Sequence, residues 1–225
     1  MKHSGKARKA GLKLIALSLP VLAAIGALGF LVPGAGRLII PAVAGVWLVF
    51  ALFTLFFFRD PTPRAPAGAG LVLAAAHGTV DALEAGNEPE FMGGQCQRIS
   101  IFLSVLDVHV QNAPIAGKVA WLKYTKGRFL NAMRADSARH NENVLLGFTA
   151  DEPPGRRVAV RVIAGVIARR IVPFARLGDT VAPGERISLV QFGSRADVYL
   201  PADAKIRVKL GDHVVGGETV LAVWE

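Results

Sequence analysis

The chain has 225 residues, of which 52% are apolar, with 26 lysines and arginines, 17 aspartates and glutamates, and a single cysteine. So apolar a composition excludes a disordered or collagen-like chain, and the length suits one domain with an appendage. With only one cysteine, Cys96, an internal disulfide framework and a multi-cysteine zinc site are also excluded.

The positive charge is concentrated at the N-terminus. Residues 1–58 contain six cations and no acid, so their net charge is +6. Residues 59–225 contain 20 cations against 17 acids, a net charge of +3. The basic character belongs mostly to the first quarter of the chain, and no motif or aromatic–basic stripe favours nucleic-acid binding.

This first quarter has the pattern of a membrane anchor. Uncharged runs of 23 residues (14–36) and 21 residues (38–58) are each long enough to cross a bilayer as a helix, and a turn-like segment links them. Five cations precede the first run, and Arg59 and Arg64 follow the second, so the positive-inside bias places both ends in the cytoplasm. We therefore predict a basic tail and a two-span membrane hairpin over residues 1–58, with a re-entrant or interfacial hairpin as the alternative.

Residues 59–225 predict a β-rich domain. Short β-branched runs alternate with Gly, Pro and Asp, and four of them have the period-two pattern of strands: 99–103, 157–162, 187–190 and 206–210. The polar stretch 129–141 predicts a helix or an irregular excursion, and Pro61, Pro63 and Pro66 predict a stiff linker after the anchor. The expected fold class is mainly β (β-rich α+β), as a sandwich or barrel-like domain.

An internal repeat supports this expectation. The pattern Gly-Asp-x-Val-x-x-Gly-Glu occurs at residues 178–185 and again at 211–218, an offset of 33 residues. It is typical of a turn between two short strands, in which glycine adopts a positive φ. Such turns resemble those of biotinyl- and lipoyl-type domains. A carrier domain needs a lysine at a hairpin tip, whereas Lys209 lies just before a turn, so we interpret the repeat as architecture.

Few residues have obvious chemical roles. His77 lies in an apolar turn, where a structural role is the default interpretation. His109 follows a strand-like run, and the sequence is equally compatible with a structural and a catalytic role for it. No two histidines have the i, i+4 spacing of a helical metal site, so no metal is expected. Gly193-Ser194 by itself predicts a turn. A hydroxyl next to a glycine also suits backbone self-cleavage, because no Cβ shields the carbonyl of Gly193.

Several spaced blocks of residues provide a more specific signal than any of these features. They are Phe57-Phe58-Arg59-Asp60-Pro61, Asp107-Val108-His109-Val110, Gly127-x-Phe129-Leu130-Asn131-Ala132, Asn141-Glu142-Asn143, Ile163-Ala164-Gly165 and Phe192-Gly193-Ser194-Arg195-x-Asp197-Val198-Tyr199-Leu200-Pro201. In content and order they resemble the phosphatidylserine decarboxylase family, from about residue 57 to the C-terminus. The resemblance is to the short bacterial type, which has a membrane hairpin.

This resemblance implies a self-processing proenzyme. Ser194 attacks the carbonyl of Gly193, the amide becomes an ester, and elimination followed by loss of ammonia leaves a pyruvoyl group at position 194. The products are a β chain, residues 1–193, and an α chain, residues 194–225, which stay together as a heterodimer. The covalent pyruvoyl cofactor forms a Schiff base with the amine of phosphatidylserine and accepts the electron pair left when CO2 departs, which gives phosphatidylethanolamine.

The resemblance also suggests roles for two histidines. It makes His109 the candidate acid or base. Where the family has Ser-Pro-Ala-Asp-Gly, this chain has an alanine-rich segment with His77 in place of an aspartate implicated in self-cleavage, so His77 is the candidate base. Asp81 is the nearest alternative carboxylate. Longer relatives have a second histidine where this chain has Asn112.

The expected partners are phosphatidylserine and an anionic membrane, and the expected location is the bacterial inner membrane, with the catalytic domain facing the cytoplasm. The sequence leaves open whether the two-chain unit assembles further. The alternative function is that of a membrane-tethered, lipoyl-like binding module that is non-catalytic or impaired in cleavage. That alternative predicts an intact bond between residues 193 and 194.

Overall fold

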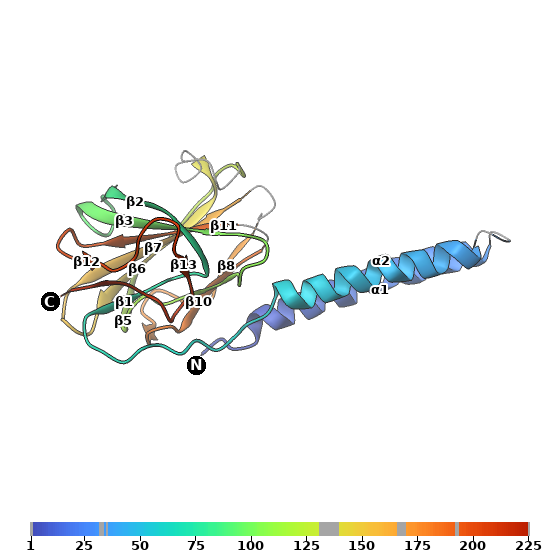
Figure 1. Cartoon of the computed structure of the whole chain (residues 1–225), viewed down its shortest axis with the longest axis horizontal. Coiled ribbons are helices and arrows are strands. Elements are labelled where there is room, and N and C mark those ends of the chain that lie inside the picture. The colour runs from blue at the N-terminus through green and yellow to red at the C-terminus, as the bar shows by residue number, and fades with distance from the viewer. Residues whose placement is uncertain are drawn as a thin grey trace. The chain divides into compact units, whose positions relative to one another are not determined.

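The computed structural model describes residues 2–31, 34, 36–130, 140–165, 170–191 and 194–224. Its contacts divide the chain into two compact units. One unit is Gly5–Asp60, and the other is Met1–Ser4 together with Pro61–Glu225. Figure 1 shows two long helices in the first unit and strands in the second.

Two helices, α1 (Lys6–Phe30) and α2 (Gly36–Phe57), form the first unit as an antiparallel pair (Figure 1). Both are long and apolar enough to cross a membrane, and only 6% and 11% of their most apolar windows are buried. Between the helices, Trp47 Nε1 donates a hydrogen bond to Ser18 Oγ at 2.9 Å. The core helix of a soluble protein would bury most of such a window, so this exposed apolar surface is better suited to lipid.

The second unit is built from β1 to β14, which confirms the prediction of a mainly β domain. The strands are β1 (Leu71–Leu73), β2 (Gly78–Glu88), β3 (Gly94–Leu103), β4 (Val110–Asn112), β5 (Gly117–Thr125), β6 (Asn143–Ala150), β7 (Arg157–Ala164), β8 (Ile171–Pro173), β9 (Thr180–Val181), β10 (Arg186–Val190), β11 (Ser194–Leu200), β12 (Lys205–Ile206), β13 (His213–Val214) and β14 (Val220–Val223). They form three sheets, ordered β1-β14-β12, β4-β10-β8 and β13-β2-β3-β11-β7-β6-β5-β9.

The eight-stranded sheet curls until its two edges approach each other. Its edge strands, β13 and β9, belong to the two copies of the sequence repeat. The copies touch at their second glycines, since a Cβ added to Gly217 would lie 3.0 Å from the Cα of Gly184. This close approach leaves no room for a side chain, and it explains the barrel-like curl of the sheet (Figure 1).

Each copy of the repeat makes the same turn. Oδ2 of Asp179 and Oδ2 of Asp212 each accept a hydrogen bond from the backbone N–H three residues earlier, at 2.8 and 3.0 Å. The glycines before them, Gly178 and Gly211, have φ values of 91° and 87°, in the left-handed region that favours glycine. The expected turn between short strands is therefore present twice.

Three of the four predicted strands are confirmed, and one is wrong in extent. The runs 99–103, 157–162 and 187–190 lie within β3, β7 and β10. The run 206–210 is a strand only at its start, in β12, because the Lys209 N–H turns to the Asp212 carboxylate at 3.0 Å and so begins the repeat's turn. The excursion predicted over 129–141 falls mostly outside the described residues.

Candidate active site

Ser194 begins β11 and is held between two neighbouring strands. It pairs with Leu103 of β3 and with Ala164 of β7. The residue is fully buried, and Oγ has no hydrogen-bond partner among the described residues. A buried hydroxyl without a partner costs free energy, which suits a group kept for reaction better than one kept for structure. The preceding residue, Gly193, lies outside the described residues.

Two short segments connect the surroundings of Ser194 with His109. From Leu103, opposite Ser194, residues 104–108 lead directly to His109. On the other side, the N–H of Val190 donates to the His109 carbonyl at 3.1 Å, and only three residues separate Val190 from Ser194. The fold therefore brings these two predicted site residues into one neighbourhood.

The ring of His109 is fully buried and oriented by the backbone. Its Nδ1 lies 2.9 Å from the carbonyl oxygen of Asp107. A carbonyl oxygen only accepts hydrogen bonds, so Nδ1 is the donor in this contact. The contact fixes the orientation of the His109 ring.

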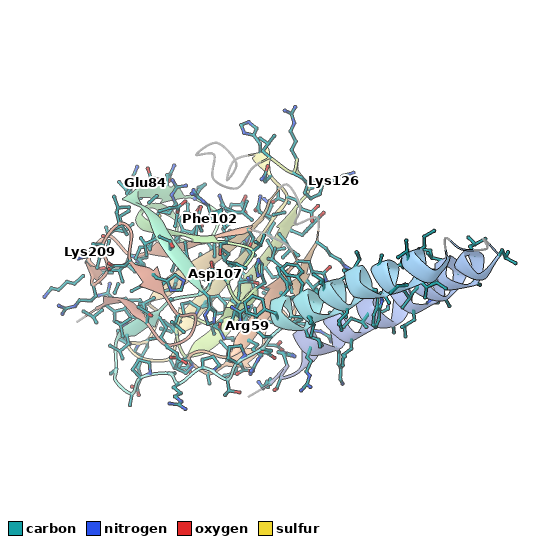
Figure 2. The ribbon with its side chains drawn as sticks, turned by 45° about the vertical axis from the view of Figure 1, so that its right-hand side comes forward. Arg59, Glu84, Phe102, Asp107, Lys126 and Lys209 are labelled. Carbon is teal, nitrogen blue, oxygen red and sulfur yellow. The ribbon has the colours of Figure 1, made fainter. Side chains whose placement is uncertain are left out.

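Asp107, which Figure 2 labels together with Phe102 of β3, organises the loop that carries His109. Its Oδ2 accepts hydrogen bonds from the backbone N–H and the hydroxyl of Ser104, at 2.8 and 2.7 Å, and its Oδ1 lies 3.1 Å from Nε2 of His213. Burial acts to raise the pKa of Asp107, but the hydrogen bonds from Ser104 and His213 outweigh it and hold the pKa below the ordinary value. Asp107 is therefore an ionised anchor for the loop.

His77 lies just before β2 and is half-buried. A Cβ added to Gly216 would lie 3.0 Å from Cδ2 of His77 and 2.8 Å from Oδ1 of Asn112, so both side chains flank this glycine. Thr79 and Arg195 both pair with Phe102, so β3 lies between the His77 end of β2 and the Ser194 end of β11. Two strand spacings make this separation about 10 Å between backbones.

Asp81 is not available as a replacement for the missing aspartate. It lies at a bulge of β2 and forms an ion pair with Arg195, whose side chain points to the face of β11 opposite Ser194. Arg195 is 5% exposed, so Asp81 balances a nearly buried charge. On the same outer face, burial raises the pKa of Asp197, and Arg98 lies 3.5 Å from its Oδ2.

Neither of two cavities formed by the described residues is lined by Ser194, His77 or His109, whereas Asp81 lines the second. One of about 570 Å³ lies between α1 and α2, with an apolar lining that includes Val21, Val46 and Phe50. The other, of about 540 Å³, lies on the outer face of β2 and β3 beside Arg98 and Arg195. Among the described residues, no group of three or more His, Cys, Asp or Glu side chains is arranged to hold a metal ion.

Asp107 and His213 were not recognised from the sequence as site residues. The spacing of Ser104 and Asp107 is typical of a turn closed by an aspartate, and this signal would have identified Asp107. The side chain of His213 is 60% exposed, and it also binds Asp107. These two residues are 106 positions apart, so no local pattern predicts their contact.

Comparison with known proteins gives a consistent result. Residues 50–222 match the family described as phosphatidylserine decarboxylase. A protein of Symbiobacterium thermophilum named phosphatidylserine decarboxylase proenzyme is 43% identical over 180 residues, which cover 80% of this chain and 83% of that protein. A protein of the same name from Geobacter sp. (strain M21) is 40% identical over 214 residues, 95% of this chain and 92% of that protein. The equivalent from Gluconobacter oxydans is 46% identical over 184 residues, 78% of each chain.

Proposed function

This chain belongs to the phosphatidylserine decarboxylase family, and we propose that it acts through a pyruvoyl group made from its own Ser194. The enzyme is a decarboxylase made as a zymogen, and its reaction converts phosphatidylserine to phosphatidylethanolamine and CO2. The observation that carries the proposal is the buried Ser194 hydroxyl, which has no hydrogen-bond partner among the described residues.

The surroundings of Ser194 suit the formation of this group. Ser194 and its neighbours on β3 and β7 are fully buried, which limits the access of water. Once formed, a pyruvoyl carbonyl supplies an acceptor for the electron pair left at the substrate carbon when CO2 departs. Metal ligands are not needed for this chemistry.

Self-cleavage assigns a step to Ser194 and another to a base. Ser194 Oγ forms a bond to the carbonyl carbon of Gly193, the amide bond between residues 193 and 194 breaks, and the freed nitrogen takes up a proton and becomes the amine of residue 194. The hydroxyl proton must pass to a base, and we assign this role to His77, which occupies the family's aspartate position. A histidine changes its charge near neutral pH and is suited to accept this proton.

We assign His109 as the acid or base of the decarboxylation itself. Hydrogen bonding of Nδ1 to the Asp107 carbonyl orients the ring, and we assign the proton transfer to Nε2. The ring is fully buried, so a proton at Nε2 is delivered with little competition from water. Removal of CO2 leaves a carbon that must be protonated, and His109 is the donor in this proposal.

The substrate also explains the helical unit. Two helices that are apolar enough to cross a membrane would hold the enzyme where phosphatidylserine resides. The cations before α1 and after α2 favour an arrangement with both ends, and thus the catalytic unit, in the cytoplasm of a bacterial cell membrane.

Mass spectrometry of the purified protein tests the proposal. We expect a C-terminal fragment of residues 194–225 that carries a pyruvoyl N-terminus, and reduction by borohydride should block it and abolish activity. In Ser194→Ala, the chain should stay intact and inactive. Ser100→Ala is the matched control, because Ser100 is also a fully buried serine, on the neighbouring strand β3, and it should be cleaved normally. An active wild-type enzyme with an intact chain or a plain serine at position 194 would refute the proposal.

A further inference from the structure

The loop between Leu103 and His109 presents an apolar tip. Val105 is 40% exposed and Leu106 is 62% exposed, whereas Leu103 and His109 on either side are fully buried. In a turn that faces only water, Gly, Asn, Asp, Ser and Pro are the usual residues. Two adjacent apolar side chains at this position indicate a surface that meets an apolar partner.

The tip is held rigidly in this exposed position. The Asp107 N–H donates to the Ser104 carbonyl at 3.0 Å, which closes a turn around Val105 and Leu106. The Leu106 N–H donates to Ser104 Oγ at 3.3 Å, and Ser104 Oγ donates to Asp107 Oδ2 at 2.7 Å. The two side chains are therefore not exposed by fraying of the loop, and the same hydrogen bonds tie them to His109.

Other exposed leucines have an architectural explanation that Leu106 lacks. Leu177 is 67% exposed and Leu210 is 60% exposed, and each directly precedes the Gly-Asp of one copy of the repeat. Equivalent positions in the repeat thus share the same exposure. Leu106 lies outside the repeat, on the loop that connects the partner strand of Ser194 to His109.

We propose that Val105 and Leu106 insert into the interface of the phospholipid bilayer and seat the site on the headgroup layer. The inference rests on the proposed function, because a phosphatidylserine headgroup must reach Ser194 and His109, both of which are buried. Because the apolar tip lies next to these residues, its insertion into lipid would bring the headgroup layer to the site.

Charges around the tip suit an anionic bilayer. The Asp107 side chain is 14% exposed and is covered by His213, which is 60% exposed, so an imidazole faces outward rather than a carboxylate. Arg170 is exposed, and its carbonyl accepts a hydrogen bond from the N–H of Gln191, which follows Val190, whose own N–H donates to the His109 carbonyl. An exposed arginine beside an anionic surface favours its binding.

The first test compares two substrates with the full-length enzyme reconstituted in phospholipid vesicles. On phosphatidylserine within the vesicles, Leu106→Ser should raise the apparent KM about tenfold, the order expected for loss of a partly buried leucine side chain, and should leave kcat unchanged. On dihexanoyl phosphatidylserine below its micelle concentration, Leu106→Ser should equal the wild type. Leu106→Phe should restore activity on vesicle lipid, and Leu177→Ser should change neither reaction.

The second test measures the depth of the tip without reference to activity. A polarity-sensitive fluorophore on Leu106→Cys should shift to the blue in vesicles and be quenched by lipid-borne quenchers, whereas the same label on Leu177→Cys should do neither. The native Cys96 is buried, which confines the label to the new cysteine. The inference would be overturned if the labels at positions 106 and 177 behaved alike in vesicles, or if the label at position 106 were as shielded in detergent as in vesicles. It would also be overturned if Leu106→Ser lost as much activity on the dihexanoyl substrate as on the vesicle lipid. An uncleaved, inactive wild type would instead refute the proposed function, while the label would still report the depth.

Discussion

At the scale of single residues, the site depends on side chains that are paired across long stretches of sequence. Arg195 directly follows the serine that we propose is cleaved, and its buried guanidinium is balanced by Asp81 on β2. Alternate residues of a strand face opposite sides, so this pair holds β11 from the outer face while Ser194 faces the interior. The pair thereby fixes the start of β11 without occupying the space around the Ser194 hydroxyl.

Removing the charge of Asp81 should destabilise the folded protein more than removing that of Glu84. In Asp81→Asn, the buried Arg195 loses its counter-charge, at a cost of about 2 kcal/mol in the free energy of unfolding. The melting temperature in detergent should fall by about 4–8 °C. Glu84 pairs with Arg98 but its side chain is 49% exposed, so Glu84→Gln should cost less than about 1 kcal/mol. Equal melting temperatures for the two variants would contradict this difference.

The two histidines should separate cleavage from decarboxylation. We expect His77→Ala to slow the appearance of the C-terminal fragment, because a base is removed from self-cleavage. We expect His109→Asn to be cleaved and to form the fragment, but to decarboxylate phosphatidylserine at least about 100-fold more slowly. Gel densitometry during synthesis and release of CO2 measure the two steps. Cleavage of His77→Ala at the wild-type rate would remove His77 from the mechanism.

At the scale of elements, the loop 104–109 couples the two sheets that surround the site. It leaves β3 opposite Ser194 and enters β4, which pairs with β10. Its shape is fixed by Asp107, whose carboxylate binds Ser104 within the loop and His213 on β13. Because β13 belongs to the predicted α chain, this carboxylate also links the two products of cleavage.

The contribution of Asp107 to stability should depend on pH. Its pKa is lowered in the folded protein, so the ionised form is favoured by folding. This stabilisation is fully present above the ordinary pKa of 3.8 and is lost as the pH falls through the lower folded value. The melting temperature of Asp107→Asn should therefore lie below that of the wild type at pH 5–7, and the gap should close in acid.

Asp203 provides the control for this experiment. Arg156 also lowers the pKa of Asp203, but the Asp203 side chain is 58% exposed. Solvent screens exposed pairs, so Asp203→Asn should change the melting temperature little at any pH. A pH-independent gap between the wild type and Asp107→Asn would show that the carboxylate acts through packing and not through its charge.

The repeat shows how a short pattern organises a whole sheet. Each turn docks on the strand that it borders, since the Asp179 carbonyl accepts from the Val119 N–H and the Asp212 carbonyl from the Val80 N–H, at 2.8 and 2.9 Å. Both strands, β5 and β2, begin with Gly-x-Val, which is a second pair of matching segments outside the longer repeat. The two copies therefore form equivalent edges of one curled sheet.

At the scale of the whole molecule, the predicted cut divides sheets rather than domains. β11 lies between β3 and β7, β13 pairs with β2, and β14 pairs with β1. Each of these three strands of the C-terminal fragment thus pairs with a strand of the N-terminal fragment. Backbone hydrogen bonds of a buried sheet are lost only when the sheet unfolds, so the cut should leave the two fragments associated.

We therefore expect the cleaved protein to behave as one particle in mild detergent. Size-exclusion chromatography should give the same elution volume for the wild type and for the uncleaved Ser194→Ala protein. Under denaturing conditions, the wild type alone should release a fragment of residues 194–225. Loss of this fragment from the wild type during purification in mild detergent would contradict the expected association.

Much of the organisation could be predicted because it depends on residues that are adjacent in the sequence. Two long uncharged runs next to cations predict the two apolar helices by length and charge alone, and the alternation in 99–103 and 157–162 predicts β3 and β7. The same alternation failed at 206–210, where the side chain of Asp212 ends the strand early. A backbone N–H that donates to a side-chain carboxylate replaces the strand pattern there.

The sequence by itself determined the apolar helices, the mainly β class, the repeated turn and, through spaced blocks, the family, and it led to the proposal that Ser194 is the reacting serine. Only the tertiary structure decided which groups surround that serine. Strand pairing places Leu103 opposite Ser194, and the loop after Leu103 leads to His109. Asp81 instead forms an ion pair with Arg195, and His213 binds Asp107. These contacts join residues about 90 to 115 positions apart, and they follow from sheet order and register, which local patterns do not encode.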